Sequence, residues 1–305
     1  MTAETVVGRE PLAELSFEGG EAPPAPAVEA GAGARGRTRT RQALSVAGIG
    51  LYAGFFLLPI AFLVSLTFKT RDEVLLGRFF TDKPTLENWW KAFEVIHLTA
   101  FVWHSLLIAT LSAVLTLIVA APATYAVVRL RRGEFVGSLA LSSYIAPPVV
   151  ALLPLFFLMR WLGLLNSIPG MVLLYGFMNV PVAYWLLAGF VRKIPAALDE
   201  AAWIDGAGFI RTFVLIDLPL LVPGLVASGL ICLILAYNEF LFASLFAQDE
   251  SVRGLTVAIS LFQGDRFVNF GQMAVASLVG ITPIYVIALL FQDRLIGGLT
   301  AGGVK

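Results

Sequence analysis

The stretch from Gln42 to Phe68 decides the fold class and reads QALSVAGIGLYAGFFLLPIAFLVSLTF. It contains no charged residue. A helix needs about 20 apolar residues, rising 1.5 Å each, to cross about 30 Å of hydrocarbon, so this stretch is long enough to span a membrane. Because lipid offers no hydrogen-bond partner to open backbone groups, we expect the stretch to be helical.

Further apolar runs follow the first one along the chain. The composition agrees with them, because 58% of the 305 residues are hydrophobic and 14% are charged, against about 25% charged residues in soluble domains. The runs do not alternate apolar and polar residues as membrane barrel strands do. We therefore predict an all-α integral membrane protein with six transmembrane helices, at about 43–68, 102–128, 136–159, 168–191, 221–246 and 272–291.

Residues 1–42 differ from the transmembrane domain that we predict over 43–305. They are rich in Ala, Gly, Pro and Glu, and such a composition cannot bury a core, so the segment is predicted to be a disordered tail.

Six spans place both termini on one side. Most of the 21 Lys and Arg residues lie on the tail side, which predicts cytoplasmic termini, although the basic residues between Lys69 and Ala100 run against this rule.

Several kinds of chemistry are excluded by the residue counts. One cysteine and two histidines allow neither an intrachain disulfide nor a Cys-rich metal site, and we expect no metal site and no catalytic residue. The 21 basic and 21 acidic residues balance, so no basic surface for nucleic acid is predicted. No Gly-Lys pair occurs, and without a phosphate-binding P-loop the chain is not expected to bind or hydrolyse ATP by that route.

The segment between the fourth and fifth apolar runs carries the functional signal. From Arg192 to Pro219 it reads RKIPAALDEAAWIDGAGFIRTFVLIDLP. Proline is typical of a first helical turn, and acids such as Asp199 and Glu200 are favoured near a helix N-terminus, so Pro195 is predicted to open a helix at its first turn. Gly206 is expected to end this helix. A second, short amphipathic helix is predicted to follow and to stop at Pro219.

This segment resembles the signature loop of binding-protein-dependent ABC importers. The family pattern is Glu-Ala-Ala, three residues, Gly, nine residues, Ile, one residue and Leu-Pro, which is matched here by Glu200, Ala201, Ala202, Gly206, Ile216, Leu218 and Pro219. A plain interfacial helix-turn-helix would match so many fixed positions only by rare coincidence. We therefore take residues 192–220, with Asp205 among them, as a candidate ATPase-coupling loop.

Other stretches resemble the carbohydrate-uptake branch of this family, and in particular the maltose-type second permease subunit. They are Thr85–Trp89, Asn238-Glu239-Phe240 and the C-terminal Gly297–Lys305. The resemblance implies the type I ABC importer permease fold. It also implies a membrane-spanning subunit that forms half of the translocation pathway for a sugar or oligosaccharide.

The resemblance further implies partners and a location. We expect a second related permease subunit, an ATPase dimer that binds ATP and Mg, and an extracytoplasmic solute-binding protein, in the bacterial inner membrane. Glu200 is expected to face a basic residue of the ATPase. The C-terminal tail is expected to reach into the ATPase dimer, which assigns contacts to Thr300, Gly302, Gly303 and Lys305.

Asn238 and Glu239 form a separate candidate site in the fifth span. Glu239 lies 16 residues past Pro223, roughly 24 Å along a helix, and acids at such depth usually face a partner or a water-filled path. The sequence leaves open whether these residues line the substrate path or serve helix packing. It also leaves open glycerol phosphate or polyamine as the solute, and an ion-coupled secondary transporter with Glu239 as its proton site. A membrane enzyme is disfavoured, because no reactive cluster occurs at one face.

Overall fold

The computed structural model describes the backbone of residues 32–133, 135, 137–138, 142, 147–262 and 269–303, with side chains from 45 to 292 within these ranges. The regular elements in the described ranges are all helical. By its packing the chain divides into two units, Met1–Phe56 and Leu57–Lys305. Helix α1 (Ala32–Thr67) crosses the boundary between them, and the candidate sites lie in the second unit.

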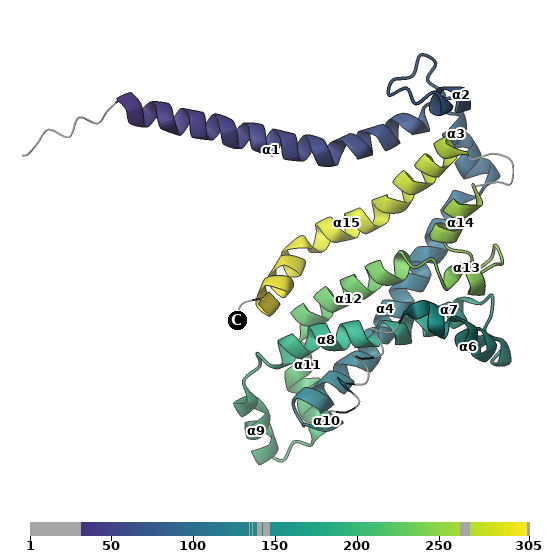
Figure 1. The fold of residues 1–305 in the computed structure, drawn as a ribbon. Coiled ribbons are helices and arrows are strands. Elements are labelled where there is room, and N and C mark those ends of the chain that lie inside the picture. Colours follow the sequence, from purple (N-terminus) through teal and green to yellow (C-terminus); the bar gives the residue numbers. More distant parts are fainter. Residues whose placement is uncertain are drawn as a thin grey trace, which may run out of the picture. The chain divides into compact units, whose positions relative to one another are not determined.

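The second unit holds the end of α1 and a series of further helices (Figure 1). Its described helices are α2 (Arg71–Leu75), α3 (Glu87–Trp90), α4 (Leu98–Val128), α6 (Pro148–Trp161), α7 (Ile168–Met178), α8 (Val180–Val191), α9 (Ala196–Ile204), α10 (Phe209–Thr212), α11 (Leu218–Leu220), α12 (Val222–Tyr237), α13 (Ala243–Phe246), α14 (Leu255–Leu261) and α15 (Phe270–Gly303). Two π-helical turns, η1 (Lys91–Val95) and η2 (Phe213–Asp217), interrupt the series.

Three helical segments are long and apolar enough to cross a membrane unbroken, namely Ser45–Thr67, Leu98–Val128 and Phe270–Gln292. Two bent pairs of helices raise the number of candidate spans to five, Ile168–Met178 with Val180–Val191 at 46° and Phe209–Leu220 with Val222–Tyr237 at 76°. The remaining predicted span, 136–159, falls partly outside the described residues, and its described part is the 14-residue helix α6. The all-helical prediction agrees with the structure, and the count of six spans stays a prediction.

Three predicted boundaries differ from the structure. Helix α1 begins at Ala32 inside the predicted disordered tail, where four arginines favour helix although Gly33 and Gly36 do not. The fourth predicted span bends at Asn179, just before Pro181, because proline has no N–H for the helical ladder. The fifth predicted span, 221–246, is not one helix, because residues 238–242 are non-helical between α12 and α13.

Helix α4 forms the centre of the second unit and packs along α7, α8 and α12. Small side chains permit the close approach, and a Cβ at Gly176 of α7 would lie only 2.6 Å from the Leu115 side chain of α4. Thr116 adds a hydrogen bond across the same contact, donating from Oγ1 to the Gly176 carbonyl at 2.8 Å. Small residues and such interhelical hydrogen bonds are the usual means of helix association in lipid.

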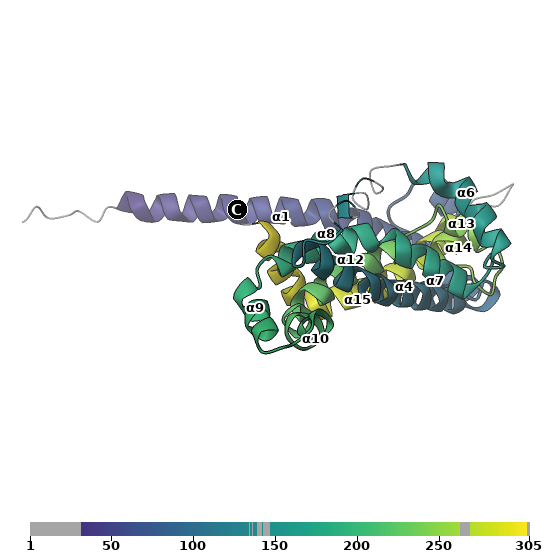
Figure 2. The same cartoon turned by 90° about the horizontal axis from the view of Figure 1, so that it is seen from below.

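The two ends of α4 carry different structures. Helices α9 and α10 lie near its C-terminal end, and α13 and α14 lie toward its N-terminal end (Figure 1). The view from below shows the same separation along the bundle (Figure 2). At the N-terminal end the amide of Leu255 donates to Ser105 Oγ at 2.8 Å. The candidate coupling loop therefore lies at one end of α4, and α13 and α14 lie toward the other.

Candidate functional site

The candidate coupling loop folds as two helical legs joined by a tight turn. Helix α9 begins at Ala196, so Pro195 is its N-cap and lies one residue before the first turn in which the sequence placed it. Its C-terminus is a Schellman motif, in which the amide of Gly206 donates to the Trp203 carbonyl at 3.1 Å and that of Ala207 to the Ala202 carbonyl at 2.9 Å. This motif needs a left-handed residue, and Gly206 supplies it with φ of 83°.

The second leg runs through α10, η2 and α11. The rings of Trp203 and Phe209 meet edge to face at 5.4 Å and tie this leg to α9 across the turn. The leg ends at Leu220, one residue beyond the predicted stop at Pro219. Pro219 directly follows the π-helical turn η2 within this continuous helical run, and because proline has no N–H for the helical ladder, the run ends soon after it. The chain then bends into α12 at Leu221.

The signature residues are divided between the surface and the interior of this loop. Glu200, Ala201, Asp205, Gly206 and Pro219 are exposed. Ala202 is buried, and Ile216 and Leu218 are half-buried. An open groove of about 380 Å³ is lined by Ala201, Ala202, Asp205 and Ile216 among others. The motif thus presents a carboxylate and small side chains outward and uses its apolar members for packing.

Two large apolar side chains beside the motif are also exposed, and the sequence analysis did not single them out. Ile204 is 86% exposed and Ile210 is 81% exposed. They end one leg and begin the other, on either side of the Gly206 turn. Exposed apolar residues rimmed by charges are typical of a protein interaction surface. Their position next to the signature motif was the available signal.

A buried charged group stabilises the base of the loop. The Arg129 guanidinium forms ion pairs with Asp199 of α9 and with Asp217 of η2, in the latter case with 3.6 Å between Nη2 and Oδ1. Burial raises the pKa of the Asp217 carboxyl above its ordinary value, the adjacent Asp199 raises it further, and Arg129 acts in the opposite direction. From the sequence alone, Asp199 is only a favourable acid in the first turn of α9.

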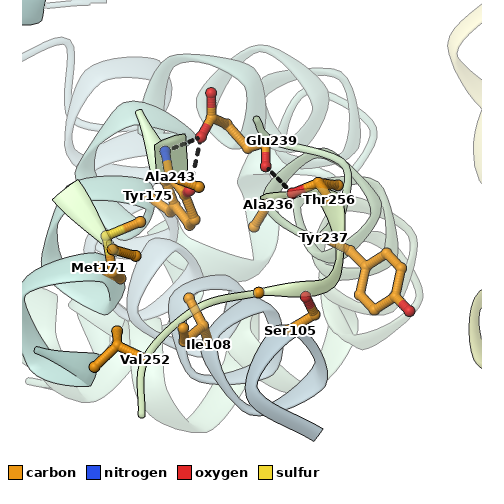
Figure 3. Close-up of a pocket in the computed structure, with 12 residues that line it drawn as sticks. Ser105, Ile108, Met171, Tyr175, Ala236, Tyr237, Glu239, Ala243, Val252 and Thr256 are labelled. Carbon is orange, nitrogen blue, oxygen red and sulfur yellow. Dashed lines mark hydrogen bonds between the residues drawn. The ribbon is translucent and has the colours of Figure 1, made fainter. Parts of the chain in front are cut away.

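Glu239 lies in the non-helical break after α12 and makes several hydrogen bonds (Figure 3). Its Oε2 accepts from the Tyr175 hydroxyl at 2.6 Å and from the Ala243 amide at 3.1 Å. Its Oε1 accepts from the Phe242 amide at 3.0 Å. The carboxylate therefore caps α13 and joins it to α7.

The cavity beside Glu239 is small. Figure 3 shows it lined by Glu239, Tyr175 and side chains from α4 and α12. Its volume of about 20 Å³ holds about one water molecule and no sugar. Asn238, the other candidate, is exposed and donates to the Ile234 carbonyl at 2.9 Å. The geometry supports the packing alternative for Glu239 in this conformation.

We expect Glu239→Gln to be tolerated. With its amide oxygen in the Oε2 position, the glutamine still accepts from the Tyr175 hydroxyl and the Ala243 amide, and only the hydrogen bond from the Phe242 amide is lost. Glu239→Leu should instead lower the stability, since each buried donor left unpaired costs about 1–3 kcal/mol. Uptake and thermal stability of the two variants, measured side by side, check this. A loss of uptake in Glu239→Gln at unchanged stability would contradict it and assign the charge to the transport path.

The C-terminal tail continues the last helix. Thr300, Gly302 and Gly303 lie in the final turns of α15, and Lys305 lies outside the described residues. The backbone of this tail stays helical to Gly303. The tail therefore reaches roughly 18 Å beyond Phe291, at 1.5 Å per residue.

Among the residues whose side chains are described, no group of three or more His, Cys, Asp or Glu side chains could hold a metal ion.

Comparison with known proteins identifies the family. Residues 118–299 match the model of the binding-protein-dependent transport system inner membrane component. The chain belongs to this family. The matched range contains α9 to α14, and so the whole coupling loop lies within the part that defines the inner membrane component.

Curated relatives match most of the length of this inner membrane component. The sulfoquinovosyl glycerol transport system permease of Agrobacterium fabrum is 35% identical over 82% of this chain and 89% of its own. The trehalose/maltose transport system permease of Thermococcus litoralis is 34% identical over 87% and 97%. The trehalose transport system permease of Mycobacterium tuberculosis is 32% identical over 84% and 94%.

Solved structures show the same fold. A chain of a bacterial ABC transporter involved in the import of the acidic polysaccharide alginate superposes with a TM-score of 0.70 at 21% identity, covering 84% of this chain and 96% of its own. A chain of the MetNI methionine ABC transporter, in inward-facing form, gives a TM-score of 0.55 at 18% identity, covering 66% and 95%. The inner membrane component described above therefore has the ABC importer permease fold.

Proposed function

We propose that this chain is the membrane-spanning subunit of an ATP-driven importer and forms half of the translocation pathway for a sugar or oligosaccharide. The observation that carries the proposal is the coupling loop, whose signature residues fold into two legs with Glu200 exposed. The relatives named for trehalose, maltose and sulfoquinovosyl glycerol support a saccharide as the solute.

The proposed complex contains this chain, a second related permease, an ATPase dimer and an extracytoplasmic solute-binding protein. ATP and Mg bind to the ATPase subunits, since this sequence has no Gly-Lys pair. The exposed isoleucines Ile204 and Ile210 supply apolar contacts to the ATPase, and Glu200 supplies a carboxylate for one of its basic residues. Both termini lie on the cytoplasmic side in this arrangement.

The test is reconstitution of the complex purified through an N-terminal tag on this chain. Proteoliposomes with the solute-binding protein outside and ATP at the ATPase face should accumulate a radiolabelled saccharide, with trehalose and maltose as the first probes. Uptake should follow ATP and be indifferent to an uncoupler. Uptake that follows a proton gradient without ATP would establish the ion-coupled alternative. Uptake of glycerol phosphate or spermidine in place of saccharides would keep the importer and replace its solute.

We also propose that the end of α15 contacts the ATPase dimer, because the resemblance to the family extends through the C-terminal residues. Deleting Thr300–Lys305 should weaken recovery of the ATPase with this chain, or lower ATP-driven uptake, without affecting membrane insertion. Co-purification and uptake measure the two effects. Insertion should be unaffected because chain ends usually contribute little to folding. A truncated chain that assembles and transports normally would show that the tail makes no contact that matters for either.

A further inference from the structure

The inner end of α4 holds three buried charges that are not part of the signature motif. Arg129 follows the last residue of α4, and its side chain is 10% exposed. The side chains of Asp199 and Asp217 are 1% and 0% exposed. Ionised groups are costly to bury unless they are paired, so a chain that keeps three of them together calls for an explanation.

The arginine contacts both legs of the coupling loop. It pairs with Asp199, which precedes the Gly206 turn, and with Asp217, which follows it. Its Nη2 also donates to the carbonyl of Ile194, just before α9, at 2.9 Å. A guanidinium presents several donors in a rigid plane and can serve these acceptors together.

Apolar side chains from the same elements enclose the charges. Val191, Ile194 and Leu221 form a buried cluster, with Val128 of α4 packed against it. The ring of Tyr125 in α4 lies 5.1 Å from that of Phe213 in η2. Neither aspartate accepts a well-aligned hydrogen bond within the described part of the chain. Their stabilisation therefore depends on the charge of Arg129.

The chain itself connects the coupling loop only to α8 and α12, which precede and follow it. Helix α4 is the element against which both of these helices pack. A loop held by its two covalent ends alone would be free to tilt relative to α4. The three charges add a directional polar connection to this central helix, beside the apolar contacts that Tyr125 and Val128 of α4 make with the loop.

We propose that Arg129 is a positioning residue that joins both legs of the coupling loop to the inner end of α4, so that a displacement of the loop moves α4 together with α8 and α12. This proposal rests on the proposed function. Asp199 and Asp217 are the two acceptors of Arg129, and we call these three side chains together the joint. The expected consequence of loosening it is ATP hydrolysis without a matching amount of transport.

The deciding measurement is the number of saccharide molecules imported per ATP hydrolysed in proteoliposomes that contain the whole complex. Asp199→Asn combined with Asp217→Asn removes both negative charges and keeps the side-chain shapes. We expect this variant to assemble and hydrolyse ATP, with the import ratio lowered at least about fivefold, the scale of a weak coupling between sites. Arg129→Lys keeps the charge and loses the planar fork, and should lower the ratio to a smaller extent.

A charge exchange adds a second line of evidence. Arg129→Asp alone leaves three acids together and should abolish import. Adding Asp199→Arg to it should restore part of the import ratio, because a cation again lies between two carboxylates. Arg131→Gln is the matched control, since Arg131 is an exposed arginine two residues beyond Arg129 and lies outside the coupling loop. It should leave the ratio unchanged.

Two outcomes would overturn the proposed role of Arg129, and a third would overturn the proposed function instead. A wild-type import ratio in the double asparagine variant would overturn the role of Arg129. The double asparagine variant could instead fail to assemble. If Arg129→Lys then has a wild-type ratio and the charge exchange gives no rescue, the charges serve folding alone. If the unmodified complex imports no saccharide with ATP, the proposed function fails and not the joint.

Discussion

Glu200→Lys should abolish transport while the chain inserts and folds normally. Glu200 is exposed on α9 and makes no ion pair with another described residue, so the fold does not depend on its charge. In the proposed complex its carboxylate meets a basic residue of the ATPase. Replacing it with a cation removes one favourable pair and creates a repulsive one, a change of about 2–5 kcal/mol at an interface. ATP-driven uptake and co-purification of the ATPase measure the effect.

The control for this variant is Glu250→Lys. Glu250 is also an exposed acid, but it lies in the connection between α13 and α14, near the opposite end of α4. The substitution Glu250→Lys changes the net charge of the chain by the same amount as Glu200→Lys and should leave ATPase binding intact. Normal uptake in Glu200→Lys would show that this face of α9 does not dock on the ATPase.

Gly206→Pro should have an effect of similar size for a different reason. The residue has φ of 83°, whereas proline holds φ near −65°. Proline also removes the N–H that donates to the Trp203 carbonyl. A strained backbone of this kind costs about 1–3 kcal/mol, so the turn is expected to rearrange and move the two legs apart. Uptake should be lost while insertion, measured by membrane fractionation, is retained.

Two alanine variants separate the effect of the left-handed backbone at Gly206 from the effect of an added side chain. Space is open around both Gly206 and Gly208, because a Cβ at either would meet no heavy atom within 4 Å. Gly208 has φ of −77°, which alanine adopts readily, so Gly208→Ala should transport normally. Gly206→Ala should lie between the wild type and the proline variant. Equal behaviour of Gly206→Pro and Gly208→Ala would mean that the turn geometry does not matter for coupling.

The legs of the coupling loop were predictable because their signals are local. Pro195 and Gly206 act on their own turns, through a fixed φ and a left-handed φ, and the helix between them lies where the sequence predicted it, with its start shifted by one residue. The same holds for the long apolar helix Leu98–Val128, whose length alone indicates a span. Such features need no knowledge of the rest of the molecule.

The features that were missed depend on distant contacts. Asp199 looks like an ordinary helix N-terminal acid until Arg129 and Asp217 are brought beside it. An aspartate within the apolar run Phe213–Leu221 and an arginine directly after an apolar span were the available signals. The break after α12 was likewise hidden, because Glu239 reads as one acid in an apolar run and its partner Tyr175 lies far away in the sequence.

The break after α12 has a consequence for how the chain fits a bilayer. Helix α12 has 16 residues and spans roughly 24 Å, which is shorter than the hydrocarbon layer of about 30 Å. The missing length is made up by non-helical residues 238–242, and open backbone of this kind is tolerated at membrane depth only where protein or water covers it. Glu239 satisfies part of it from within. We therefore expect the membrane to be locally thinned around α12, or the exposed side of this break to be shielded from lipid tails in the assembled importer.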